Sequence, residues 1–305
     1  MTRDLDAWPA LPVAEWADTY ATLHMWTQVV GKIRLALAPR MNHWWEVPLY
    51  ITARGLTTSP MPYAGGSVEM TFDFIDHQLV IETSAGARDA IPLAPQSVAA
   101  FYARVLAALR RLDIDVRIWP MPVEIPSPIR FDRDEQHASY DAAWAQRCWR
   151  VLSSVDAVLK EFRARFIGKS SPVHFFWGSF DLAVTRFNGR RTDARATADP
   201  MTREAYSHEV ISAGFWPGRP GTIDAVFYAY AVPEPAGFKT ARIAPAAAVY
   251  NEEFAEYLLK YEDVRTAPSP RAALLDFLQT TYESAATLAH WNRAELERQA
   301  QPQTI

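Results

Sequence analysis

Apolar residues recur at helical spacing in five segments of the chain. In the first of them, Trp26, Val30 and Ile33 fall on one face of a helix, and Pro39 ends it. This periodicity predicts helices over residues 13–38, 97–112, 140–166, 252–261 and 271–291.

A second pattern is strict alternation. From Val68 to Phe74 apolar side chains alternate with polar ones, which predicts a strand with one face in water. Asp76 and His77 form a turn into a second strand at 79–82, so the two strands make a hairpin. Less regular apolar runs predict further strands at 44–52, 116–119, 174–184, 207–215 and 223–232.

The run at 174–184 is apolar enough for a strand buried on both faces, yet it contains His174 and Asp181. On one continuous strand, Asp181 would share a face with Phe175, Trp177 and Ser179. Burying an unpaired charge is costly, so Asp181 needs a partner, a proton or a pocket. Two interpretations are open. Asp181 pairs with a cation (Arg186 or Arg54) or a backbone N–H, or it lies in an aromatic pocket with a raised pKa.

The segment 119–128 is rich in proline and cannot be helical, so it predicts an extended connector. It divides the chain into an N-terminal half (1–118), a connector (119–138), a C-terminal half (139–295) and a flexible tail (296–305). Each half reads as helix, three strands and helix, with an aromatic strand entered through a histidine. We therefore predict an α+β fold of two similar α-β-β-β-α halves with mostly antiparallel sheets, an internal duplication about a pseudo-two-fold axis, and a shared cleft.

Charge and composition narrow the functional classes. The net charge of −4 and the pI of about 6.0 argue against nucleic acid as a partner. Cys148 is the only cysteine and falls in an apolar helical stripe, where a thiol acts as a small hydrophobe. No apolar run is long enough to span a membrane, and the first residues do not read as a secretory signal. These features predict a cytoplasmic protein.

The candidate site residues follow from these patterns. We expect Asp181 to be an acid–base group, with His174, His43 and His208 transferring protons or orienting a ligand. Aromatic and polar neighbours are expected to contact the ligand, namely Trp44, Trp177, Ser179, Trp216 and Tyr50. His24 and Gln28 lie on one helix face with Lys32, and this face either contributes to the site or is solvated surface.

A metal site is a weaker prediction. His43, His174, His208 and Glu209 have suitable side chains for zinc or iron, but no pair of them has the short spacing of a metal motif. The chain contains no phosphate-binding loop, dinucleotide fingerprint or nucleophile elbow. Whether the protein binds a cofactor, and which one, therefore stays open.

Several long segments resemble a bacterial family catalogued as a domain of unknown function, DUF5996. They cover residues 22–32, 42–45, 49–56, 171–182, 206–209, 214–218 and 227–230. The chain departs from the family pattern at Asn188 and Lys260. The resemblance implies a bacterial protein that forms a single unit, and it implies no activity or ligand.

Three functions are consistent with these features. The first is an enzyme acting on a small organic molecule in an aromatic-lined cleft. The second is a non-catalytic small-molecule-binding protein with the same cleft. The third is a structural or partner-binding protein, in which Asp181 would be satisfied by a salt bridge and would have no cavity beside it. The reaction, the substrate and the oligomeric state stay open.

Overall fold

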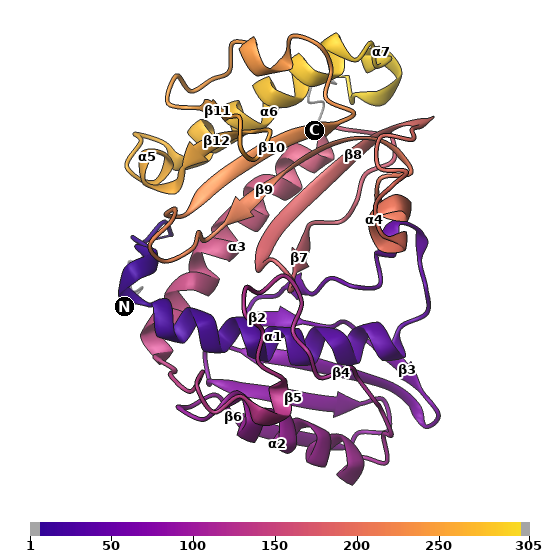
Figure 1. Cartoon of the computed structure of the whole chain (residues 1–305), viewed down its shortest axis with the longest axis vertical. Helices are drawn as coiled ribbons and strands as arrows, with labels where there is room; N and C mark the ends of the chain where they lie inside the picture. The colour runs from indigo at the N-terminus through magenta and orange to yellow at the C-terminus, as the bar shows by residue number, and fades with distance from the viewer. Residues whose placement is uncertain (1–6, 300–305) are drawn as a thin grey trace, which may run out of the picture.

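The computed structural model describes residues 7–299. Within that range the chain forms seven α-helices and two antiparallel sheets of six strands each (Figure 1). This confirms the predicted α+β class. No helix within the same range is both long enough and apolar enough to cross a membrane.

The first sheet has the order β1-β2-β4-β5-β6, and β3 pairs with the free part of β4. The hairpin of β4 and β5 confirms the alternation seen in the sequence, because Met70 and Phe72 are fully buried. Helix α2 begins as predicted after Ser97, whose hydroxyl accepts a hydrogen bond from the Ala100 N–H. The bounds are β1 Tyr50–Ile51, β2 Gly55–Thr57, β3 Met61–Tyr63, β4 Gly66–Asp73, β5 Gln78–Thr83, β6 Arg88–Pro92 and α2 Val98–Arg111.

The second sheet has the order β11-β12-β10-β9-β8-β7. Helices α3 and α6 pack on one of its faces, and both were predicted from their apolar periodicity. The bounds are α3 Ala142–Ala164, β7 His174–Phe176, β8 Asp181–Arg191, α4 Pro200–Ala205, β9 His208–Trp216, β10 Val226–Val232, β11 Val249–Asn251, β12 Glu256–Lys260, α5 Tyr261–Arg265, α6 Pro270–Leu288 and α7 Arg293–Leu296.

The two sheets meet at a single bridge between their edges. Leu49 and Phe175 exchange two backbone hydrogen bonds of 2.9 Å, just before β1 and within β7. Helix α1 (Ala17–Leu37) crosses between the sheets (Figure 1), and every residue from Thr22 to Arg34 is buried. A helix buried on all sides has no solvated face, so the surface interpretation of His24, Gln28 and Lys32 was wrong.

Three predicted elements differ from the structure. The strand at 44–52 shrinks to Tyr50–Ile51, because His43 and Trp44 adopt left-handed backbone angles (φ 59° and 60°) in a short 3-10 turn. Residues 116–119 have no regular structure. The predicted helix at 252–261 is instead a turn followed by strand β12, because pairing with β10 and β11 overrides a weak helical preference.

The internal duplication is not confirmed. It rested on matching His43-Trp44-Trp45 with His174-Phe175-Phe176, but the first segment is a 3-10 turn and the second is a strand. In the predicted tail, Leu296 ends α7 and Glu297 bridges to Phe166. The remainder, 300–305, lies outside the described residues.

Gly31 provides a test of how α1 packs. A Cβ at this position would collide with the indole ring of Trp177. Replacing glycine by alanine inside a helix ordinarily stabilises it by about 0.5–1 kcal/mol. Here we expect Gly31→Ala to destabilise the protein by about 1–3 kcal/mol in urea unfolding, because the indole has no room to move.

The matched control is Ala157→Gly, at an exposed position of α3, which measures the ordinary preference for alanine. Stabilisation of the protein by Gly31→Ala would contradict the packing of Trp177 against α1.

Candidate functional site

The run at 174–184 is a hairpin and not the single strand predicted. Strand β7 ends at Phe176, the chain reverses through residues 177–180, and β8 begins at Asp181. Phe180 closes the turn with a left-handed φ of 60°, and its N–H donates to the Phe176 carbonyl at 2.8 Å. The predicted face was therefore wrong: Asp181 lies opposite Phe176, on the face that also carries His174.

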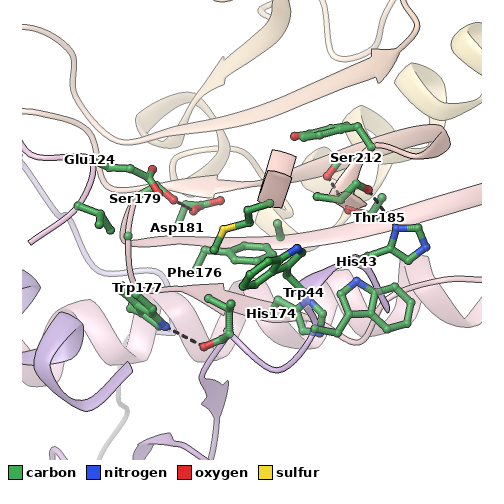
Figure 2. A pocket seen from close by; sticks show the side chains of 18 of the residues that line it. His43, Trp44, Glu124, His174, Phe176, Trp177, Ser179, Asp181, Thr185 and Ser212 are labelled. Atoms are coloured by element: carbon green, nitrogen blue, oxygen red, sulfur yellow. Dashed lines mark hydrogen bonds between the residues drawn. The ribbon is translucent and has the colours of Figure 1, made fainter. Parts of the chain in front are cut away.

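This face of the second sheet forms the wall of a cavity of about 520 Å³. The alternate residues of β8, from Asp181 to Phe187, point into it, and α3 covers the opposite face. Figure 2 shows the carboxyl groups of Glu124 and Asp181 at one end, Trp44 and Phe176 in the middle and His43 at the far end. The residues that line the cavity include Lys32, His43, Trp44, Trp119, Glu124, His174, Phe176, Trp177, Ser179, Asp181, Thr185, Ser212, Tyr228 and Tyr230.

Asp181 is 7% exposed and forms no ion pair within residues 7–299. The hydroxyls of Ser179 and Tyr228 donate to its two carboxyl oxygens. Tyr228 reaches across β9 over Gly214, where any Cβ would collide with its phenol ring. Burial raises the pKa of Asp181, and the two hydroxyl groups only partly oppose this rise.

The cations that the sequence offered to Asp181 are used elsewhere. Arg186 points to the other face of β8, where its guanidinium lies 3.5 Å from the ring centroid of Phe162. Arg54 pairs with Asp73 at 2.6 Å in the first sheet. Of the two interpretations, the geometry matches the carboxyl group in an aromatic cavity.

The charge of Asp181 acts on two more carboxyl groups. Glu124, from the proline-rich connector, is exposed at the cavity mouth, with its carboxylate against the backbone of Gly178. Desolvation, and then the charge of Asp181, raise the pKa of Glu124. Glu256 on β12 is partly buried, and the same two causes raise its pKa to about 7. Neither glutamate forms an ion pair within the described chain, so no cationic side chain of that part neutralises its carboxylate.

His24 and Gln28 hold the site together from α1 and do not line its cavity. His24 Nε2 donates to the Gly178 carbonyl at 2.9 Å, and burial lowers the pKa of His24 to about 4, so its ring is neutral. Gln28 makes two bonds of 2.9 Å with the backbone of Val123, one as donor and one as acceptor. Together they fix the β7–β8 turn and the connector, so both are positioning residues.

Two of the three predicted histidines, His174 and His43, line the cavity, and their rings have different partners. His174 is 1% exposed and its Nε2 has no hydrogen-bond partner in the part of the chain described. Burial, and then nearby Arg34, lower the pKa of His174 to about 3. His43 donates from Nδ1 to the Glu204 and Ala205 carbonyls at 3.1 Å, and its Nε2 accepts from Lys169 at 2.6 Å.

The other predicted site residues divide into two groups. Trp44, Trp177 and Ser179 line the cavity. His208 does not line it, but the centroid of its ring lies 5.6 Å from that of His43. Trp216 lines a separate hollow of about 320 Å³. Tyr50 packs against His174 from outside the cavity, with 5.7 Å between ring centroids.

Glu209 does not join the histidines as a metal ligand. It points away from the cavity and pairs with Arg190 at 2.7 Å. Across residues 7–299, no group of three or more histidine, cysteine or acidic side chains is placed to hold a metal ion. Cys148 is buried as predicted, which raises the pKa of its thiol.

Sequence reasoning missed Glu124, Tyr228 and Glu256. The signal for Tyr228 was present, because Tyr228 and Tyr230 alternate with buried residues on β10 and so share the cavity face. Glu124 was read only as part of a connector. No local pattern identified Glu256, because its segment was predicted to be helical.

Removing the amide of Gln28 tests how the connector is held. Gln28→Leu keeps the volume but leaves the N–H and C=O of Val123 without partners, so we expect a loss of about 2 kcal/mol in urea unfolding. Hydrogen exchange at the Val123 amide should also become faster. The control is Gln146→Leu, at a half-buried position, which removes a 3.4 Å bond to the Phe74 carbonyl and a 2.9 Å bond from the Arg150 guanidinium. Equal losses in the two variants would contradict this role for Gln28.

Glu256 makes the stability depend on pH. Its folded-state pKa lies above the ordinary value, so its contribution is complete at acid pH and is lost as the pH rises through about 7. Asp181, Tyr206 and Tyr228 interact with it electrostatically. Between about pH 5 and about pH 8, Glu256→Gln should gain on the order of 2 kcal/mol relative to the wild type in urea unfolding.

The control for this prediction is Glu253→Gln, at an exposed position. The burial of Glu256 is contradicted if the stability difference between Glu256→Gln and the wild type is the same at both pH values.

Comparison with curated proteins and with solved structures gave no significant match. One family model matches residues 8–298, which is nearly the whole chain, and it is described as "Family of unknown function (DUF5996)". The match agrees with the resemblance of the segments around α1, the β7–β8 hairpin and β10. The chain belongs to the DUF5996 family.

Proposed function

We propose that the protein is a bacterial, cytoplasmic enzyme that transforms a small organic molecule in the cavity above β8, with Asp181 as its acid–base group. The observation that carries this proposal is a buried carboxyl group that lines an aromatic cavity and has no cationic partner among the described residues. A purely structural aspartate would be neutralised by an ion pair and closed off by packing.

The surroundings of Asp181 suit proton transfer. Its raised pKa brings the carboxyl group closer to neutral pH, where a group can both donate and accept a proton. The Ser179 and Tyr228 hydroxyls orient the carboxyl group. His174 offers a neutral imidazole on the same wall, which can orient a ligand through a hydrogen bond.

The ligand of this cavity is a small molecule and not a nucleic acid. Aromatic side chains such as Trp44 and Phe176 provide apolar surface, and polar side chains such as Asp181 lie among them on the wall of the enclosed space. The net charge of −4 also disfavours a polyanionic partner.

A non-catalytic binding protein is the second candidate. It is favoured by one observation, namely that both oxygens of Asp181 already accept hydrogen bonds from side chains of the protein. A binding protein would return its ligand chemically unchanged.

Asp181→Asn tests the enzyme directly. Wild type and variant are incubated with a bacterial metabolite extract, and mass spectrometry identifies compounds that are consumed or formed. We expect the wild type to convert at least one compound and the variant to convert it at least about a hundredfold more slowly, as befits loss of an acid–base group. Circular dichroism checks that the variant is folded.

The matched control is Asp276→Asn, at an exposed position of α6, which should convert the compound at the wild-type rate. Equal conversion by Asp181→Asn and the wild type would contradict the assignment of Asp181. Ligands that bind but are recovered unchanged would favour the binding protein.

A further inference from the structure

Lys32 on α1 is a buried cation whose charge no acidic group neutralises. The residue is 7% exposed and forms neither an ion pair nor a hydrogen bond within the chain that the structure describes. Its ammonium group lies 5.1 Å from the ring centroid of Trp119 and 5.8 Å from that of Trp177. These two rings stabilise the ammonium group by cation–π interactions, which offset only part of the free energy that the group loses when it is removed from water.

The cavity therefore carries unpaired charges of both signs. Lys32 lines it from α1, and Asp181 and Glu124 line it from β8 and the connector. The ammonium and carboxyl groups do not pair with each other, although pairing would be the ordinary way to offset their desolvation. The packing of α1 holds the backbone beside these groups in place, since Gly31 packs on Trp177 and Gln28 binds the backbone next to Glu124.

A ligand with a single charge would not satisfy this arrangement. An organic cation would neutralise Asp181 and Glu124 but would bring a like charge into the cavity of Lys32. An organic anion would neutralise Lys32 but would bring a like charge close to Asp181 and Glu124. A molecule that carries both charges would be attracted at both places, and like-charge repulsion would disfavour its one-charge relatives.

We propose that the ligand of this cavity is a small zwitterion with an apolar body, of the amino-acid type. Its ammonium group lies against Asp181 and Glu124, its carboxylate against the Lys32 ammonium, and its body against aromatic side chains such as Phe176 and Trp177. This inference rests on the proposed function in that it takes the same cavity as the ligand site. It adds the chemical class of the ligand.

A set of matched probes tests the inference by isothermal titration calorimetry. Phenylalanine carries both charges, phenethylamine lacks the carboxylate, and 3-phenylpropionate lacks the ammonium group. A second set with more widely spaced charges is 4-(aminomethyl)benzoate, benzylamine and 4-methylbenzoate. We expect at least one zwitterion to bind about tenfold or more tightly than both of its one-charge analogues, which corresponds to about 1.4 kcal/mol.

Two substitutions assign each charge to its partner. Lys32→Met should weaken binding of the zwitterion about tenfold and leave binding of its amine analogue unchanged or tighter. Glu124→Gln should weaken binding of the zwitterion and of the amine, and spare the carboxylate analogue. The controls are Lys260→Met and Glu253→Gln, at exposed positions that form no ion pair with any described residue, and these variants should bind every probe as the wild type does.

The inference is overturned if neither zwitterion binds more tightly than its one-charge analogues, or if Lys32→Met binds the zwitterion like the wild type. These outcomes leave the proposed function standing, because the loss of conversion in Asp181→Asn is measured on whichever compound the protein transforms. Conversely, a zwitterion that binds but is never converted would support this inference and contradict the enzyme.

Discussion

The packing of α1 against the β7–β8 turn determines the geometry of the whole site. Gly31 lets the indole of Trp177 lie directly on the helix, and the Trp177 N–H donates to the Val47 carbonyl at 2.7 Å. The side chain of His24 then binds the backbone of the turn, and the side chain of Gln28 binds the backbone of the connector. Because α1 also lies between the two sheets, one helix holds together the sheet that carries Asp181 and the segment that carries Glu124.

The β7–β8 turn also determines which charges face the cavity. The turn brings Asp181 to the start of β8 on the cavity face, while the cations nearby in sequence, such as Arg186, point to the helix-covered face. Within residues 7–299 the carboxyl groups are thus left without a counter-charge, and Lys32 lies near two tryptophan rings. Buried charges without partners lower the stability of the fold, and groups that are retained despite this cost typically serve binding or catalysis.

The sequence predicted the elements whose patterns are local. Helix α3 and the β4–β5 hairpin follow from periodicity, and the mixture of apolar and ionisable residues around Asp181 left two interpretations open, a paired carboxylate or a pocket. The turn at 177–180 was missed because Gly178 and Ser179 are embedded in aromatic residues typical of strands. Tyr228 was missed because its bond to Asp181 joins residues 47 positions apart, and β12 because only its neighbours make it a strand.

The central claim is that Asp181 is a desolvated carboxyl group without a cationic partner. A carbon-13 NMR titration of the side-chain carboxyl groups measures this directly, with Asp181→Asn identifying the signal. The account predicts a midpoint clearly above the ordinary aspartate pKa of about 3.9, as burial dictates. A midpoint at or below that value, as in an ion-paired aspartate, would contradict the account.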